Sequence, residues 1–99
     1  MSGSEGYSLS SASYDSKSFD VVTQESNPRD IFFKPDGTKM YIVGNNSDTV
    51  HQYTLSTAWD VSSVSYDSVS FSVAQDTFPC SIAFKPDGTK MYIAGNTTD

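Results

Sequence analysis

Short stretches of apolar residues, each ended by Gly, Pro, Asn or Asp, recur along this chain. Arg29–Phe33 and Cys80–Phe84 are apolar at alternating positions and partly on both sides, which is typical of a strand that lies between two neighbours. Val50–Ser56 alternates between two sets of side chains, as a half-buried strand does. No stretch has apolar residues at the spacing of an amphipathic helix, so the pattern predicts an all-β protein without a helix of consequence.

The ten residues FKPDGTKMYI occur twice, at Phe33–Ile42 and at Phe84–Ile93, 51 positions apart. Pro favours the first position of a tight turn, Asp favours the next, and Gly tolerates the left-handed conformation that such a hairpin requires. Each copy therefore predicts a β-hairpin. We interpret the repeated decapeptide as structural, because a phosphate-binding loop would be glycine-rich and would open a helix.

The repeat extends well beyond this decapeptide. The matching segments are Tyr7–Ser10 with Tyr53–Ser56, Ser13–Val21 with Ser65–Val73, and Asn27–Asp48 with Phe78–Asp99. Nearly the whole chain is thus two copies of one unit of four short strands, although the N-terminal copy lacks part of the stretch Thr57–Val64. The expected strands are Tyr7–Ser10, Ser13–Val21, Arg29–Phe33, Lys39–Val43, Val50–Ser56, Ser65–Val73, Cys80–Phe84 and Lys90–Ala94.

A repeated antiparallel unit of about 50 residues is the signature of a β-propeller blade. The succession of an apolar strand, PDGTKMYI, an Asn-rich turn and VHQYTLS resembles the YVTN-type and related propeller repeats. In those repeats a PDG hairpin joins the two inner strands of each blade, so the resemblance implies a β-propeller. Residues 1–6 are then a flexible lead, 7–21 two outer strands, 27–73 a complete blade, and 78–99 two inner strands.

Only one blade is complete in this arrangement, whereas propellers close with about four to eight blades. The unpaired strands at 7–21 and 78–99 would be exposed edges, which are prone to association. We therefore expect the inner pair of one copy to accept the outer pair of the next, in a head-to-tail contact that closes into a ring. Two blades per chain favour a homotrimer of six blades, with a homotetramer of eight as the alternative. A fragment of a longer propeller chain is a further interpretation.

The acidic charge of the chain argues against nucleic acids and anionic membranes as partners. The net charge is −6 and no cluster of Lys or Arg exists, so we expect no nucleic-acid partner. An acidic surface repels anionic membranes, and no apolar run is long enough to span a bilayer. The N-terminal residues lack the charged and apolar regions of a signal peptide. The sequence does not indicate a cellular compartment.

Catalytic and metal-binding groups are sparse. The chain has one His and one Cys, so an internal disulfide and a cysteine-based zinc site are excluded. His51 lies within a strand and Cys80 begins one, and both are expected to be structural. No paired carboxylates are evident, because Asp36 and Asp87 fall in turns and Asp15 and Asp67 in outer strands. The Asn-rich turns lack the calcium-loop pattern. We predict a protein that is not an enzyme and has no cofactor.

Binding is the remaining class of function. The resemblance implies that a ligand would contact the loops at the end of the blade opposite the PDG hairpins. The candidate residues there are Arg29, Asp30, Asn45, Asn46, Asp48, Ser81, Asn96 and Thr98. Repeated around a ring, such polar groups would hold a glycan or a peptide multivalently. The competing interpretations are solvated loop residues and a purely structural, self-assembling scaffold, of natural duplication or design.

Overall fold

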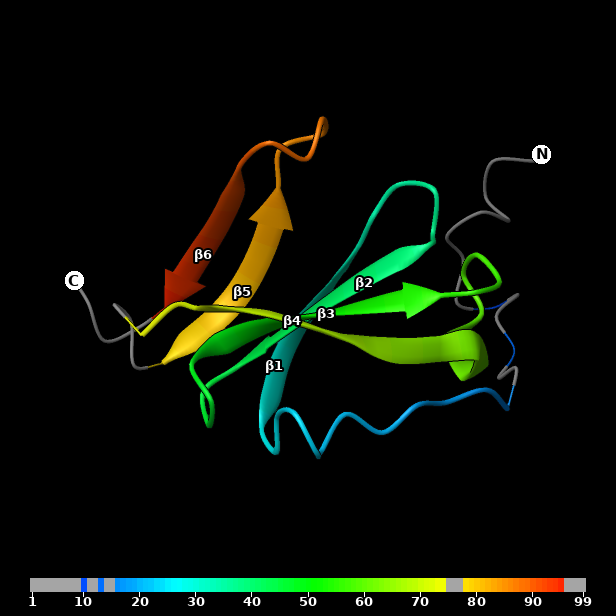
Figure 1. Cartoon of the computed structure of the whole chain (residues 1–99), viewed down its shortest axis with the longest axis horizontal. Coiled ribbons are helices and arrows are strands. Elements are labelled where there is room, and N and C mark those ends of the chain that lie inside the picture. Colours follow the sequence, from blue (N-terminus) through cyan, green and yellow to red (C-terminus); the bar gives the residue numbers. More distant parts are fainter. Residues whose placement is uncertain (1–9, 11–12, 14–15, 75–77, 96–99) are drawn as a thin grey trace.

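The computed structural model describes residues 10, 13, 16–74 and 78–95. Their six strands and one short 3₁₀ turn are β1 (Pro28–Phe33), β2 (Lys39–Gly44), β3 (Thr49–Leu55), η3 (Val61–Ser63), β4 (Val64–Ser72), β5 (Pro79–Phe84) and β6 (Met91–Gly95). The first four strands form an antiparallel sheet in chain order, and β5 and β6 form a separate two-stranded sheet (Figure 1). The all-β class is confirmed, and these six strands agree with the expected ones to within one residue at each end.

The two expected N-terminal strands have a different outcome. Residues 16–21, which make up most of the expected strand Ser13–Val21, lie in no strand, and neither do Ser10 and Ser13. A strand forms when its main-chain groups pair with those of a neighbour, and no strand among the described residues pairs with this segment. The rest of these two strands and the expected lead at 1–6 lie outside the described residues.

This N-terminal segment nevertheless packs against the four-stranded sheet. The ring of Phe19 meets the ring of Tyr53 edge to face, with centroids 6.0 Å apart. Val21 contacts the same buried cluster that contains Tyr53, and the Lys17 ammonium lies 3.3 Å from an Asp60 carboxylate oxygen. The segment therefore covers one face of the sheet without being hydrogen-bonded into it.

The two PDG turns have the predicted geometry. Gly37 and Gly88 have φ values of 76° and 78°, in the left-handed region that glycine adopts without strain. The Gly37 amide donates to the Lys34 carbonyl at 2.8 Å, and the Gly88 amide donates to the Lys85 carbonyl at 2.7 Å. Turn chemistry thus produces the same hairpin twice.

The register of the two hairpins is also the same. Phe33 lies opposite Met40 in the first, and Phe84 lies opposite Met91 in the second. Each pairing has an irregularity near its start, after Pro28 in β1 and after Pro79 in β5. The β5–β6 hairpin therefore repeats β1–β2 residue by residue.

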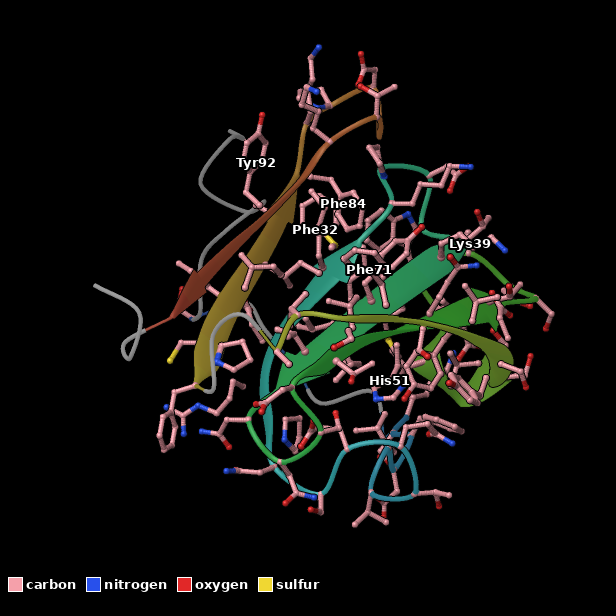
Figure 2. All side chains as sticks on the ribbon, turned by 60° about the vertical axis from the view of Figure 1, so that its left-hand side comes forward. Phe32, Lys39, His51, Phe71, Phe84 and Tyr92 are labelled. Atoms are coloured by element: carbon pink, nitrogen blue, oxygen red, sulfur yellow. The ribbon has the colours of Figure 1, made fainter. Side chains whose placement is uncertain are left out.

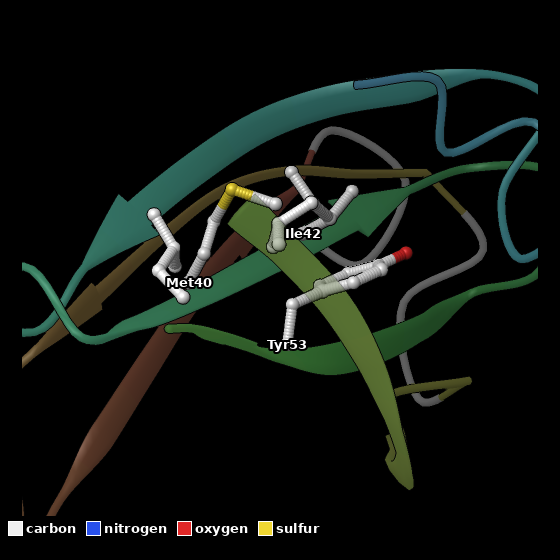
Figure 3. Close-up of a cluster of buried hydrophobic side chains, with 5 residues drawn as sticks. Met40, Ile42 and Tyr53 are labelled. Carbon is white, nitrogen blue, oxygen red and sulfur yellow. The ribbon is translucent and has the colours of Figure 1, made fainter. Parts of the chain in front are cut away.

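The two faces of the four-stranded sheet carry separate clusters. Face A consists of Met40, Ile42, Tyr53, Leu55 and Val64 (Figure 3). Face B carries Val43 and Val50, which pack with Val73 and with Ile82 of β5. The β5–β6 hairpin thus covers face B over β1 and β2 (Figure 1). None of the described residues forms a helix long and apolar enough to cross a bilayer.

Candidate functional site

The edge of β6 is the first unusual feature. Within the described part of the chain β6 pairs only with β5, whereas its counterpart β2 pairs with β1 on one side and β3 on the other. Met40 and Ile42 of β2 are 3% and 5% exposed, while the matching Met91 and Ile93 are only half-buried. Tyr92 is 57% exposed and lies on the side of β6 away from the four-stranded sheet (Figure 2). β6 is thus an apolar edge whose outer main-chain groups pair with no described strand.

A groove of about 480 Å³ lies between the two PDG hairpins. Its lining comprises Phe32, Lys34, Pro35, Asp36, Lys39, Tyr41, Gln52, Phe84, Lys85, Pro86, Asp87 and Gly88. The Phe84 ring lies 5.1 Å from that of Phe32 and 4.6 Å from that of Tyr41, centroid to centroid. These rings form an aromatic floor between β5 and the four-stranded sheet (Figure 2).

The rim of the groove is charged but balanced. Lys34 lies 3.4 Å from Asp36, and Lys85 lies 3.5 Å from Asp87, atom to atom between ammonium and carboxylate. Lys39 is likewise 3.4 Å from Asp67. Each lysine at the groove therefore has a carboxylate beside it, so the rim does not select for an anion.

Asp67 lies near this rim and accepts several side-chain hydrogen bonds. Its carboxylate accepts a hydrogen bond from the Gln52 side-chain amide at 2.7 Å and one from the Thr54 hydroxyl at 2.7 Å. Burial alone would raise the pKa of Asp67, but these hydrogen bonds and the nearby Lys39 charge lower it below its ordinary value. Gln52 and Lys39 are consequently held in fixed positions at the groove wall.

An exposed apolar surface extends from the groove along β4. Val69 lies opposite Gln52 and Phe71 lies opposite Val50 in the β3–β4 pair, so both side chains belong to face B. They are 50% and 62% exposed. Face B is covered by β5–β6 over β1, β2 and Val50 of β3, whereas among the described residues Val69 and Phe71 of β4 leave its outer part exposed.

At the other end of the sheet lie the candidate ligand residues of β1. Arg29 is exposed next to the β1 irregularity. Asp30 accepts a hydrogen bond from the Ile82 amide at 2.9 Å, which joins β1 to β5, and another from the Ile31 amide at 2.9 Å. Asp30 is therefore an internal link between the two sheets.

The candidate residues of the β2–β3 turn are near the start of β1, because Pro28 lies opposite Gly44. The Asn45 side-chain oxygen accepts a hydrogen bond from the Asn27 amide group. Asp48 has a φ of 50°, and its carbonyl accepts a hydrogen bond from the Val73 amide at 2.8 Å. Asn46 has an exposed side chain, and its main-chain amide is engaged, as described next.

Glu25 organises this end of the sheet, and the sequence patterns did not single it out. Its carboxylate is 1% exposed and accepts hydrogen bonds from the amides of Asn27, Asn46 and Ser47 at 2.9–3.1 Å, and from the Ser47 hydroxyl. Burial alone would raise the pKa of Glu25, but these donors lower it. The only sequence signal is that Glu25 and Ser47 align with Asp76 and Thr98, another carboxylate and hydroxyl.

His51 extends the same network. Its Nε2 lies 3.2 Å from the Ser47 hydroxyl and its Nδ1 lies 3.3 Å from the Tyr66 hydroxyl. Burial lowers the pKa of His51, and the charge of Glu25 partly offsets this. Because Ser47 donates its proton to Glu25, the arrangement ties a loop to a turn rather than preparing Ser47 as a nucleophile.

The remaining candidates have simpler surroundings. Ser81 is half-buried opposite Ala94. Asn96 and Thr98 lie outside the described residues. Cys80 is a free thiol whose Sγ donates to the Phe78 carbonyl at 3.2 Å. In the described ranges no three His, Cys, Asp or Glu side chains are grouped so as to hold a metal ion.

The structure thus brings together Arg29, Asp30 and the turn residues 45–48 at one end of the sheet, where the side chains of Asp30 and Asn45 are engaged within the chain. The groove and the β6 edge lie elsewhere, and they are the sites left open. Comparisons of the chain with protein-family models, with curated proteins and with solved structures gave no match.

Proposed function

We propose that this protein is a non-enzymatic, self-assembling β-propeller fragment that forms a homo-oligomeric ring. The β1–β4 sheet is one complete blade and β5–β6 is the inner half of the next. The observation that carries the proposal is the state of β6: it repeats β2 in sequence and register, yet no described strand pairs with its outer edge.

The missing outer half is supplied by another copy. The segments Tyr7–Ser10 and Ser13–Val21 match the sequences at β3 and β4, which complete the first blade. The described part of Ser13–Val21 has no strand partner within its own chain. The described residues of Ser13–Val21 pair with no strand, and the outer edge of β6 pairs with no described strand, which together favour head-to-tail exchange between copies.

The mass of the assembly tests this proposal. Size-exclusion chromatography with light scattering is expected to give three times the chain mass of 10.8 kDa, for six blades. Four times the chain mass would indicate eight blades and preserve the ring. A folded monomer of 10.8 kDa would rule the ring out, and a broad distribution of masses would favour the fragment of a longer propeller.

A glycan- or peptide-binding module is the second proposal. Its support is limited to the exposed side chains of Arg29 and Asn46, which lie at the end of the sheet where the loops gather. Asp30 and Asn45 are engaged within the chain. If a ligand binds the folded ring, adding it raises the melting temperature, so a screen of sugars and peptides by thermal shift is the test. If no sugar or peptide shifts the melting temperature, the binding proposal is rejected and the structural role is the one that remains.

A further inference from the structure

The β2–β3 pairing shows how a strand is added to this type of hairpin. Thr54 lies opposite Lys39, and Tyr53 lies opposite Met40. In the second hairpin the counterpart of Lys39 is Lys90 and that of Met40 is Met91. Tyr7–Ser10 (YSLS) matches Tyr53–Ser56 (YTLS), so its Ser8 takes the place of Thr54.

We infer that β6 receives Tyr7–Ser10 of a second copy in one defined register, an inference that rests on the proposed ring. Tyr7 and Leu9 of this added strand then fill the groove between the hairpins. In this register Ser8 of the second copy lies opposite Lys90, and Tyr7 lies opposite Met91. The groove is then a specificity pocket for another copy of the chain.

The direction of the side chains follows from the first hairpin. Tyr53 and Leu55 lie on face A together with Met40 and Ile42. The counterparts of these two β2 residues, Met91 and Ile93, point toward face B of the four-stranded sheet, where they pack on the cluster of Val43 and Val50. Because side chains at matching positions of neighbouring strands share a face, Tyr7 and Leu9 also point toward face B.

The chemistry of the groove agrees with such an occupant. Its floor is aromatic, with Phe32, Tyr41 and Phe84, and its rim lysines are already paired with carboxylates. An apolar and an aromatic side chain suit this surface better than a charged ligand does. The open part of face B at Val69 and Phe71 continues outward from the groove, where Ser13–Val21 of the same second copy would follow as the outermost strand.

A disulfide between copies tests the register. The Leu55 amide donates to the Thr38 carbonyl, so Lys39 and Thr54 form a non-hydrogen-bonded pair, the type with the closer side chains. Cβ atoms of such pairs are about 4.5–5.5 Å apart, near the range that a disulfide requires. The test variant carries Ser8→Cys and Lys90→Cys in a Cys80→Ser background.

The matched control is Ser10→Cys with Lys90→Cys in the same background. It moves the donor thiol two residues, roughly 7 Å, along the same side of the strand. Mild oxidation followed by non-reducing electrophoresis is expected to give covalent oligomers with the Ser8 variant and mainly single chains with the Ser10 variant.

The outcomes separate this inference from the proposed function. Equal cross-linking of both variants, no cross-linking, or a disulfide within one chain would overturn the register, even if light scattering still shows a ring. A monomeric wild-type protein would overturn the ring and this inference together.

A second variant tests the groove without cysteine chemistry. Leu9→Lys introduces a charge over the aromatic floor and is expected to shift most of the protein from oligomer to single chains at micromolar concentration. Ser10→Lys is the control, because its counterpart Ser56 is exposed, and it is expected to keep the oligomer. Unchanged mass for Leu9→Lys would show that the groove does not hold this residue.

Discussion

The two PDG hairpins are the same structure in two environments. In the first, Val43 is completely buried between β1, β3 and the second hairpin, whereas Ala94 at the matching position of the second is exposed. Tight turns and register are local properties, and both hairpins have them. Burial is contributed by neighbours, so a hairpin of this sequence is fully stable only when strands from elsewhere cover its outer edge.

The largest test of this comparison removes the same side chain from both hairpins. Met40→Ala is expected to lower the free energy of unfolding by about 2–5 kcal/mol, as for other buried residues. Met91→Ala is expected to cost under about 2 kcal/mol in a single chain but to approach the Met40→Ala value in a ring, where a second copy covers it. Urea unfolding at low and high protein concentration measures both. Equal effects at every concentration would contradict the difference in burial.

The next test concerns the loop end of the complete sheet. Glu25→Ala removes the acceptor of three main-chain amides and one hydroxyl, and about 4 kcal/mol of stability is expected to be lost at about 1 kcal/mol for each hydrogen bond. Asp20→Ala is the control, because Asp20 is exposed and accepts from the Val22 amide. Similar losses for the two variants in urea unfolding would show that the Glu25 network contributes little.

The glycines of the two turns differ in their surroundings. A Cβ on Gly37 would lie 2.5 Å from ring atoms of Trp59, whereas a Cβ on Gly88 would meet nothing within 4 Å. Both substitutions to Ala incur the cost of a left-handed residue, about 1 kcal/mol. Gly37→Ala is expected to cost about 1 kcal/mol more, because the indole must move.

A double-mutant cycle measures that extra cost. In a Trp59→Ala background, Gly37→Ala is expected to become as mild as Gly88→Ala, since the clash is gone. Thermal unfolding of the four variants gives the coupling. If Gly37→Ala keeps its full effect without Trp59, the contact with the indole is not its cause.

The smallest expected effect is a dependence of stability on pH. The folded pKa of Glu25 is lowered from 4.5, so its contribution is present above pH 4.5 and is lost as the pH falls through the lower folded value. The folded pKa of His51 is lowered from 6.5, so the native state already loses stability as the pH falls below 6.5. His51→Gln is expected to make the free energy of unfolding nearly independent of pH between about pH 7 and pH 5. The loss of stability at lower pH, which comes from Glu25, is expected to remain. Identical urea midpoints for variant and wild type across this range would argue against a role for His51.

The strands and turns could be predicted from the sequence because their signals are local. The apolar pattern of Cys80–Phe84 and the turn residues around Gly88 specify a hairpin without reference to the rest of the chain. The two N-terminal strands were expected on similarity to β3 and β4, but pairing depends on a partner, and the described part of Ser13–Val21 has none in its own chain.

The sites were harder to predict for the same reason. Asp30 has the sequence context of an exposed loop residue, but it accepts the Ile82 amide from a strand 52 positions away. Glu25 resembles any surface glutamate until Ser47 is brought against it. The groove is built from side chains of both hairpins, and no single segment contains its pattern.

The hydrogen bond from Ile82 to Asp30 has a consequence for symmetry. The second hairpin carries Ser81 where the first carries Asp30, so a carboxylate is present at the joint inside each chain but not at the matching position facing the next chain. A ring of such chains would alternate between two kinds of joint, with threefold rather than sixfold symmetry in a trimer. The joint between subunits would then lack this carboxylate link and depend on the strand that each chain adds to its neighbour.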